Sequence, residues 1–222
     1  DTPIQDEIIK GQPEQPSVKT EIDDHSDEIS DSINHQEDNS EQKDKNKAEL
    51  ETDKVVYLTF DDGPHPTASI EILQLLDKYD AKATYFMLEP HMKQNPDIVK
   101  GVSEKGHALG VHGVTHDISK VYKSPENFVN EMNQAIRFIK EHTDIHTHLA
   151  RAPYGSKPHM TPPFIEASNE NELILWDWNV DSKDWQLTKG GFVNHTIQQI
   201  NHLDGREPLV VLMHEKPTTA TH

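Results

Sequence analysis

The stretch YLTFDDGPHP, Tyr57–Pro66, ends a short apolar run with two adjacent aspartates, a Gly-Pro turn and a histidine. The run VVYLTF, residues 55–60, is rich in β-branched and aromatic side chains, which predicts a buried strand. After the turn, apolar residues recur at helical spacing at positions 72, 75, 76 and 79 and predict an amphipathic helix. Asp61 and Asp62 are therefore expected where a buried strand ends.

The same alternation continues along the chain. Further strands are expected over residues 81–88, 107–112, 148–153, 172–180 and 208–214, and helices over residues 95–105, 163–169 and 192–203 and after a Ser124 N-cap. About 165 residues of alternating strands and helices indicate an α/β domain with a parallel sheet and outer helices. Both a barrel and an open doubly wound sheet fit this pattern.

The N-terminal residues differ in composition from the rest. The first 54 residues contain seventeen Asp and Glu but six Lys and Arg, and every Phe, Tyr and Trp lies at Tyr57 or later. Such a segment cannot bury enough apolar surface to offset the entropy lost on ordering. We therefore expect a disordered acidic tether over residues 1–53 and one folded domain over residues 54–222.

Charge and composition exclude several classes of protein. A net charge of −18 argues against nucleic acid and anionic membrane surfaces as partners. Because the chain has no cysteine, any metal must be held by His, Asp or Glu. No run is apolar enough for membrane insertion, and no signal peptide opens the sequence. We expect a monomer that follows a removed signal or anchor, and so an extracellular protein, in the cell wall or tethered to the outer face of the membrane.

Polar residues cluster after the predicted strands. They are Asp61 and Asp62, His112 and His116, Arg151, Asp181 and Asp184, and His214. Taken singly, each has a structural explanation, such as a solvated turn, a surface histidine or salt bridge, or a core histidine. Together they lie where parallel α/β folds build their sites, because the loops at that edge converge.

The residue types favour metal-dependent hydrolysis. One Asp and two His suit Zn²⁺ or another divalent first-row ion, with positions left open for water and substrate. HGVTH carries Gly113 where an HExxH metalloprotease needs its Glu, so that interpretation fails. A second carboxylate could act as base, although spacing alone does not say which of Asp61 and Asp62 is the ligand. A histidine paired with a carboxylate such as Asp184 could protonate the leaving group.

Five segments carry a family resemblance: TFDDGP at 59–64, HGVTH at 112–116, RAPYG at 151–155, DSKDW at 181–185 and LMH at 212–214. As a set, they resemble the polysaccharide deacetylases with a NodB homology domain, carbohydrate esterase family four. The resemblance implies a distorted (β/α) barrel and a metal-dependent de-N-acetylase that acts on N-acetylated amino sugars, with cell-wall peptidoglycan as the expected polysaccharide. Chitin oligomers and poly-N-acetylglucosamine are alternatives. An inactive glycan-binding relative and a two-metal phosphoesterase are further ones.

The resemblance also implies residue roles. Asp62, His112 and His116 would bind one divalent metal, with Zn expected and Co, Ni or Mn as alternatives, and Asp61 would be the base. Arg151 would orient Asp61, the backbone N–H of Tyr154 would stabilise the oxyanion, Trp185 and Leu212 would enclose the acetyl methyl group, and Asp184 would tune His214 as the general acid.

The sequence departs from the family pattern in three places. Gly113 replaces the usual Ser or Thr after the first metal histidine, and Asp117 replaces a frequent Pro after the second. The chain also ends eight residues past His214, where the family's barrel normally adds a helix. We therefore expect an altered metal loop and a truncated C-terminus.

Overall fold

The computed structural model describes residues 55–187, 189–203 and 208–222. The chain divides into two units, Asp1–Leu50 and Glu51–His222, and everything below concerns the second. The expected acidic tether, residues 1–53, lies outside the described residues. Within the described ranges, no helix combines the length and the apolar character that crossing a membrane requires.

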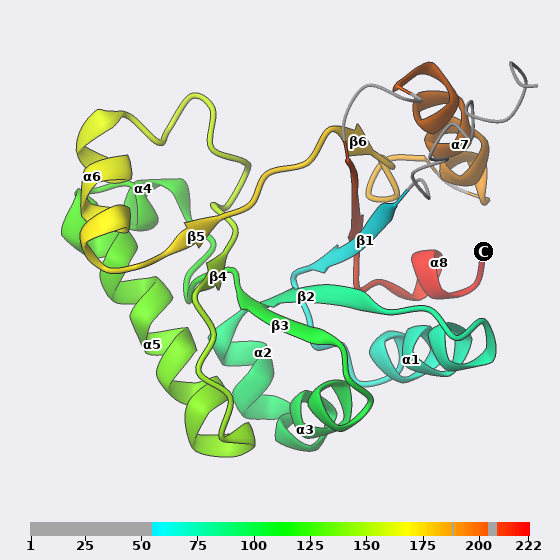
Figure 1. The fold of residues 1–222 in the computed structure, drawn as a ribbon, viewed down its shortest axis with the longest axis horizontal. Helices are drawn as coiled ribbons and strands as arrows, with labels where there is room; N and C mark the ends of the chain where they lie inside the picture. Colours follow the sequence, from blue (N-terminus) through cyan, green and yellow to red (C-terminus); the bar gives the residue numbers. More distant parts are fainter. Residues whose placement is uncertain (1–54, 188, 204–207) are drawn as a thin grey trace, which may run out of the picture. The chain divides into compact units, whose positions relative to one another are not determined.

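The described strands form one parallel sheet that curls with helices on its outside (Figure 1). The strands are β1 (Val56–Asp61), β2 (Ala83–Met87), β3 (Ala108–Val111), β4 (Leu149–Ala150), β5 (Ile174–Leu175), β6 (Val180–Asp181) and β7 (Leu209–His214), in the spatial order β5-β4-β3-β2-β1-β7-β6. Each neighbouring pair is parallel. The predicted α/β class and distorted barrel are confirmed. Among the described residues the curl stays open between β5 and β6.

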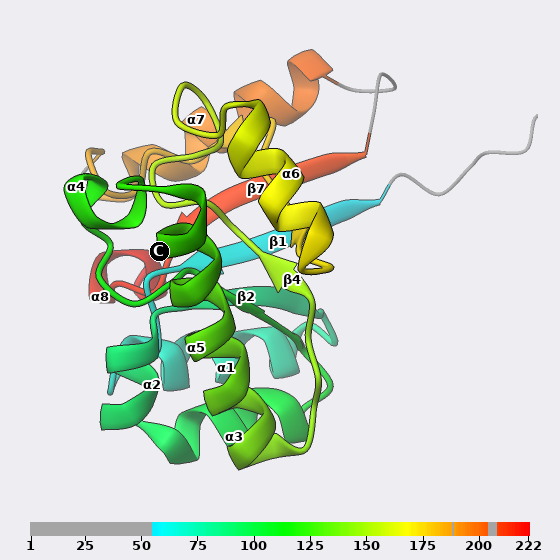
Figure 2. The same cartoon turned by 90° about the vertical axis from the view of Figure 1, so that its left-hand side faces the viewer.

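The helices cover the sheet and are α1 (Ala68–Lys78), α2 (Glu89–Gln94), α3 (Pro96–Glu104), α4 (Ile118–Val121), α5 (Pro125–Thr143), α6 (Pro162–Glu170), α7 (Gly191–Leu203) and α8 (Pro217–Ala220). In Figure 2, α1, α3 and α5 lie on the side of β1 and β2 that faces away from α7. The N-cap of α5 is confirmed, because the Ser124 side chain accepts a hydrogen bond from the N–H of Asn127. The apolar face of α5 buries Phe128, Met132 and Ile139 against the sheet.

Two expectations about strands need correction. The run over residues 55–60 is buried only from Thr59 onward, because β2 pairs with β1 only from Leu58. Residues 172–180 do not form one strand, since β5 and β6 lie at opposite edges of the sheet. Directly after β5 the N–H of Trp176 still donates to the carbonyl of Ala150 in β4 at 2.9 Å, but the carbonyl of Trp176 accepts a hydrogen bond from Arg151 Nε at 2.9 Å. The strand pairing therefore ends at this residue.

Candidate active site

The expected polar residues meet at the carboxyl edge of the sheet. Asp61 ends β1, and His214, its partner in the register, ends β7 beside it. Asp62 follows with φ of 69°, a left-handed conformation that turns the chain sharply after the strand. Asp61 is buried while Asp62 is partly exposed, so the two adjacent carboxylates lie in different surroundings.

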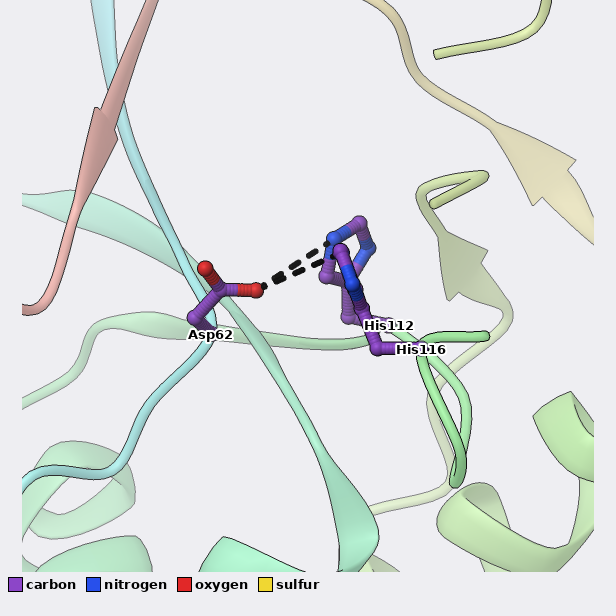
Figure 3. A group of neighbouring side chains, drawn as sticks. All are labelled: Asp62, His112 and His116. Carbon is purple, nitrogen blue, oxygen red and sulfur yellow. Dashed lines mark ion pairs between the residues drawn. The ribbon is translucent and has the colours of Figure 1, made fainter. Parts of the chain in front are cut away.

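Asp62, His112 and His116 form a cluster that could hold a metal ion (Figure 3). One ligand atom from each lies within 4.8 Å of the others. Asp62 Oδ1 lies 3.7 Å from His112 Nε2 and 3.6 Å from His116 Nε2. This oxygen is buried and accepts no hydrogen bond from the described part of the chain. A buried carboxylate oxygen without a donor is costly, and a cation would satisfy it.

The surroundings of both histidines in this cluster favour metal binding. His112 Nδ1 donates to the backbone carbonyl of Arg151 at 2.8 Å, which leaves the lone pair of Nε2 facing Asp62. Burial, reinforced by neighbouring His112, lowers the pKa of His116, so its neutral, metal-binding form is favoured. The residues present therefore fit a divalent metal.

Asp61 is held by a buried arginine. Arg151 Nη1 donates to Asp61 Oδ1 at 2.8 Å and to Thr59 Oγ1 at 2.7 Å. The guanidinium is completely buried and lies over the ring of Phe86, 4.2 Å from its centroid. Because Asp61 Oδ2 lies 3.7 Å from His112 Nε2, its second oxygen faces the metal cluster. The carboxylate is thus anchored through one oxygen and directed at the cluster through the other.

His214 is paired with Asp184. Its Nδ1 lies 2.7 Å from Asp184 Oδ1, and its backbone N–H donates to Asp184 Oδ2 at 2.7 Å. Thr219 of α8 donates to the same Oδ2 at 2.6 Å. Burial alone would lower the pKa of His214, but the hydrogen bond and charge of Asp184 outweigh burial and raise it. This pair therefore favours the protonated imidazole.

The predicted substrate residues have contrasting positions. Tyr154 has φ of 65°, its ring packs on His116 with centroids 4.6 Å apart, and its hydroxyl donates to the His116 carbonyl at 3.0 Å. Leu212 is buried in β7, whereas Trp185 is 56% exposed in the loop after β6. Asp181 caps the same loop by accepting the N–H of Lys183 at 2.9 Å.

Sequence reasoning missed several residues around the cluster. His91 Nδ1 donates to the carbonyl of Asp62 at 2.6 Å. Glu215 is buried and accepts a hydrogen bond from Ser69 Oγ through Oε2, and burial raises its pKa to about 8. The position of Glu215 directly after LMH is the signal that could have drawn attention to it. A cleft of about 660 Å³ opens beside the cluster and is lined by Asp62, His116, His91, Glu215, Lys216 and neighbours.

The structure is that of an α/β protein with a curled parallel sheet of the barrel type and a candidate metal-binding cluster of one Asp and two His at the carboxyl edge of the sheet. Residues 47–172 match the family "Polysaccharide deacetylase". The chain belongs to this family.

Two relatives and one solved structure illustrate the similarity. YheN of Bacillus subtilis is 41% identical over 170 residues, 75% of this chain and 60% of YheN. A peptidoglycan-N-acetylglucosamine deacetylase of Bacillus cereus is 40% identical over 136 residues, 61% of this chain and 49% of that enzyme. The chain thus spans about half to three fifths of these two relatives. The crystal structure of the polysaccharide deacetylase Bc1974 from Bacillus cereus superposes with a TM-score of 0.69 at 35% identity, covering 76% of this chain and 82% of that one.

Proposed function

We propose that this protein hydrolyses the N-acetyl groups of N-acetylated amino sugars in cell-wall peptidoglycan and releases acetate. One observation carries the proposal: Asp62 Oδ1, buried and without a hydrogen-bond donor among the described residues, faces two histidines. A peptidoglycan deacetylase among the relatives supports the choice of substrate. The cleft beside the cluster has the volume of a typical ligand site.

The proposed metal is a single divalent ion, with zinc preferred. Asp62, His112 and His116 would hold it, since one carboxylate and two neutral imidazoles match the donor set that zinc takes in hydrolytic sites. When bound, the ion would polarise the acetamide carbonyl and make water more acidic. Cobalt, nickel and manganese suit the same donors and are separated by the experiment below.

The chain's own residues would then move the protons. Asp61, fixed by Arg151, accepts a proton from the attacking water while the carbon–oxygen bond forms. His214, protonated through its pairing with Asp184, passes a proton to the nitrogen as the carbon–nitrogen bond breaks. The products are acetate and a free amine on the sugar.

The remaining roles concern substrate and setting. In the proposal, the backbone N–H of Tyr154 stabilises the oxyanion, and a single such donor is worth about 2.7–4 kcal/mol in other oxyanion holes. Trp185 and Leu212 enclose the acetyl methyl group. A peptidoglycan substrate places the enzyme outside the cytoplasm, in the cell wall or at the outer face of the membrane, where it acts as a monomer.

Acetate release from peptidoglycan and from N-acetylglucosamine oligomers tests this function. The metal-free protein is reconstituted with Zn²⁺, Co²⁺, Ni²⁺ or Mn²⁺ and compared with Asp62→Ala and Asp61→Asn. Asp80→Asn, in an exposed turn, is the matched control. We expect Asp62→Ala to lose metal and activity, and Asp61→Asn to lose activity while it retains metal.

Two other outcomes would redirect the proposal. Release from chitin oligomers but not from peptidoglycan would change the substrate. Tight glycan binding without release, whichever metal is supplied, would overturn the enzyme and favour an inactive glycan-binding relative.

A further inference from the structure

The loop between the two candidate histidine ligands is held by a carboxylate outside the cluster. Glu131, on α5, accepts the N–H of Val114 at 2.9 Å and of Thr115 at 2.8 Å through Oε2. Its Oε1 accepts the Thr115 hydroxyl at 2.7 Å. Three hydrogen bonds thus connect one side chain to the residues that separate His112 from His116.

The other side of this loop is held as well. The carbonyl of Gly113 accepts the N–H of Glu89, the first residue of α2, at 3.0 Å. Glu89 is buried, and its Oε1 accepts from Gln134 Nε2 at 3.1 Å. Because Gln134 lies three residues after Glu131, the same face of α5 supports the loop directly and through α2.

Gly113 makes this arrangement possible. Its φ of 91° lies in the left-handed region, which favours glycine. A Cβ at this position would lie 3.2 Å from Glu131 Oε2 and 3.2 Å from Met132 Cε. The departure from the Ser or Thr usual in the family therefore coincides with a carboxylate packed closely against the loop.

We propose that Glu131 is a positioning residue that holds His112 and His116 in place to bind the metal; this rests on the metal site of the proposed function. Hydrogen bonds from backbone N–H groups to an ionised carboxylate are stronger than bonds between neutral groups. Outer partners that orient metal ligands typically change metal affinity by about 10- to 100-fold when they are removed. Glu131 acts one step further out, through the backbone that carries both histidines.

The test measures the dissociation constant for Zn²⁺ by competition with a chelator, and the melting temperature of the metal-free protein. Glu131→Gln removes the charge and one acceptor, and we expect metal affinity to fall about 10-fold or more with little change in the metal-free melting temperature. Glu141→Gln, exposed on the last turn of the same helix, is the control and should match the parent. Glu131→Asp keeps the charge but shortens the side chain, so that it no longer reaches the loop. A loss of Zn²⁺ affinity comparable to that of Glu131→Gln would show that the hydrogen bonds, and not the charge alone, are responsible.

Thr115→Val keeps the inference testable if the Glu131 variants do not fold. Thr115 is exposed, and the substitution removes only one of the three hydrogen bonds, so we expect about a three- to tenfold loss of affinity. Zn²⁺ affinities of folded Glu131→Gln or of Thr115→Val within twofold of the parent would overturn the positioning role. Failure of the parent itself to bind Zn²⁺ would instead overturn the proposed function, on which this role depends.

Discussion

Replacing Asp184 with Asn should shift the basic limb of the pH–activity profile to lower pH, so that activity is lost earlier as the pH rises. Asp184 accepts from both the ring and the backbone of His214, at 2.7 Å each, and from Thr219 at 2.6 Å. The backbone and hydroxyl donors can still bond to an amide oxygen. The substitution therefore removes mainly the negative charge that faces the imidazole.

The size of the shift follows from the loss of that charge. A hydrogen bond to a charged group contributes about 1.5–3 kcal/mol and a neutral one about 0.5–1.5 kcal/mol. The difference of about 1–1.5 kcal/mol corresponds to about one pKa unit. Burial acts in the same direction once the carboxylate is gone, because it already lowers the pKa of His214.

The assay is the pH dependence of kcat for the metal-loaded enzyme. In the proposed mechanism His214 donates a proton, so activity falls as the pH rises through its pKa, and this basic limb should move about one unit lower in Asp184→Asn. Thr219→Val, which removes a donor but keeps the charge, should move it much less. A folded Asp184→Asn variant with an unchanged basic limb would refute the pairing as the source of the acid.

Three further predictions concern stability. Arg151→Met leaves the buried Asp61 without its charge partner and should lower the free energy of unfolding by about 3–5 kcal/mol in urea; a loss below about 1 kcal/mol would contradict it. Gly63→Ala would place Cβ 1.6 Å from Glu215 Oε1 and should cost about 1–3 kcal/mol or more, read as a lower melting temperature that Glu215→Ala partly restores. The pKa of Glu215 is raised from 4.5 to about 8, so the native state keeps a proton that the unfolded state loses, and stability should fall as the pH rises between these values. Glu215→Gln should flatten that pH dependence. If denaturant titrations at pH 5 and pH 7.5 give the same change in the free energy of unfolding for the parent and for Glu215→Gln, a neutral carboxyl in the native state would be refuted.

The approach of Asp62, His112 and His116, the candidate metal cluster, could be predicted from sequence because two of these residues directly follow strands. Asp62 comes after β1 and His112 after β3, two strands separated only by β2 in the sheet. In a parallel sheet the carboxyl ends share one edge, so placing each residue at a strand end is enough to predict that they approach. The prediction needed no knowledge of side-chain contacts.

The path of residues 172–180 could not be anticipated in this way. Their apolar and aromatic residues favour a strand. Because strand propensity reflects side-chain packing as much as backbone preference, it does not fix where a strand ends. Arg151, far away in sequence, supplies donors to the carbonyls of Trp176 and Asp177. A side chain therefore satisfies backbone groups that the pattern assigns to a sheet.

The contacts of Glu131 with the loop between His112 and His116 could not be predicted from the sequence either. In the sequence Glu131 is a polar residue beside Met132, on a helix whose apolar face can be recognised from the residue spacing. Glu131 is therefore naturally interpreted as solvent-exposed. Its importance comes from two backbone N–H groups of a loop that no strand or helix satisfies. The N–H of Val114 is partly buried and needs an acceptor, so the irregular loop between the two candidate ligands requires a partner from elsewhere in the fold. Sequence identifies the candidate ligands, but which residue supplies that acceptor depends on where α5 lies relative to the loop that follows β3.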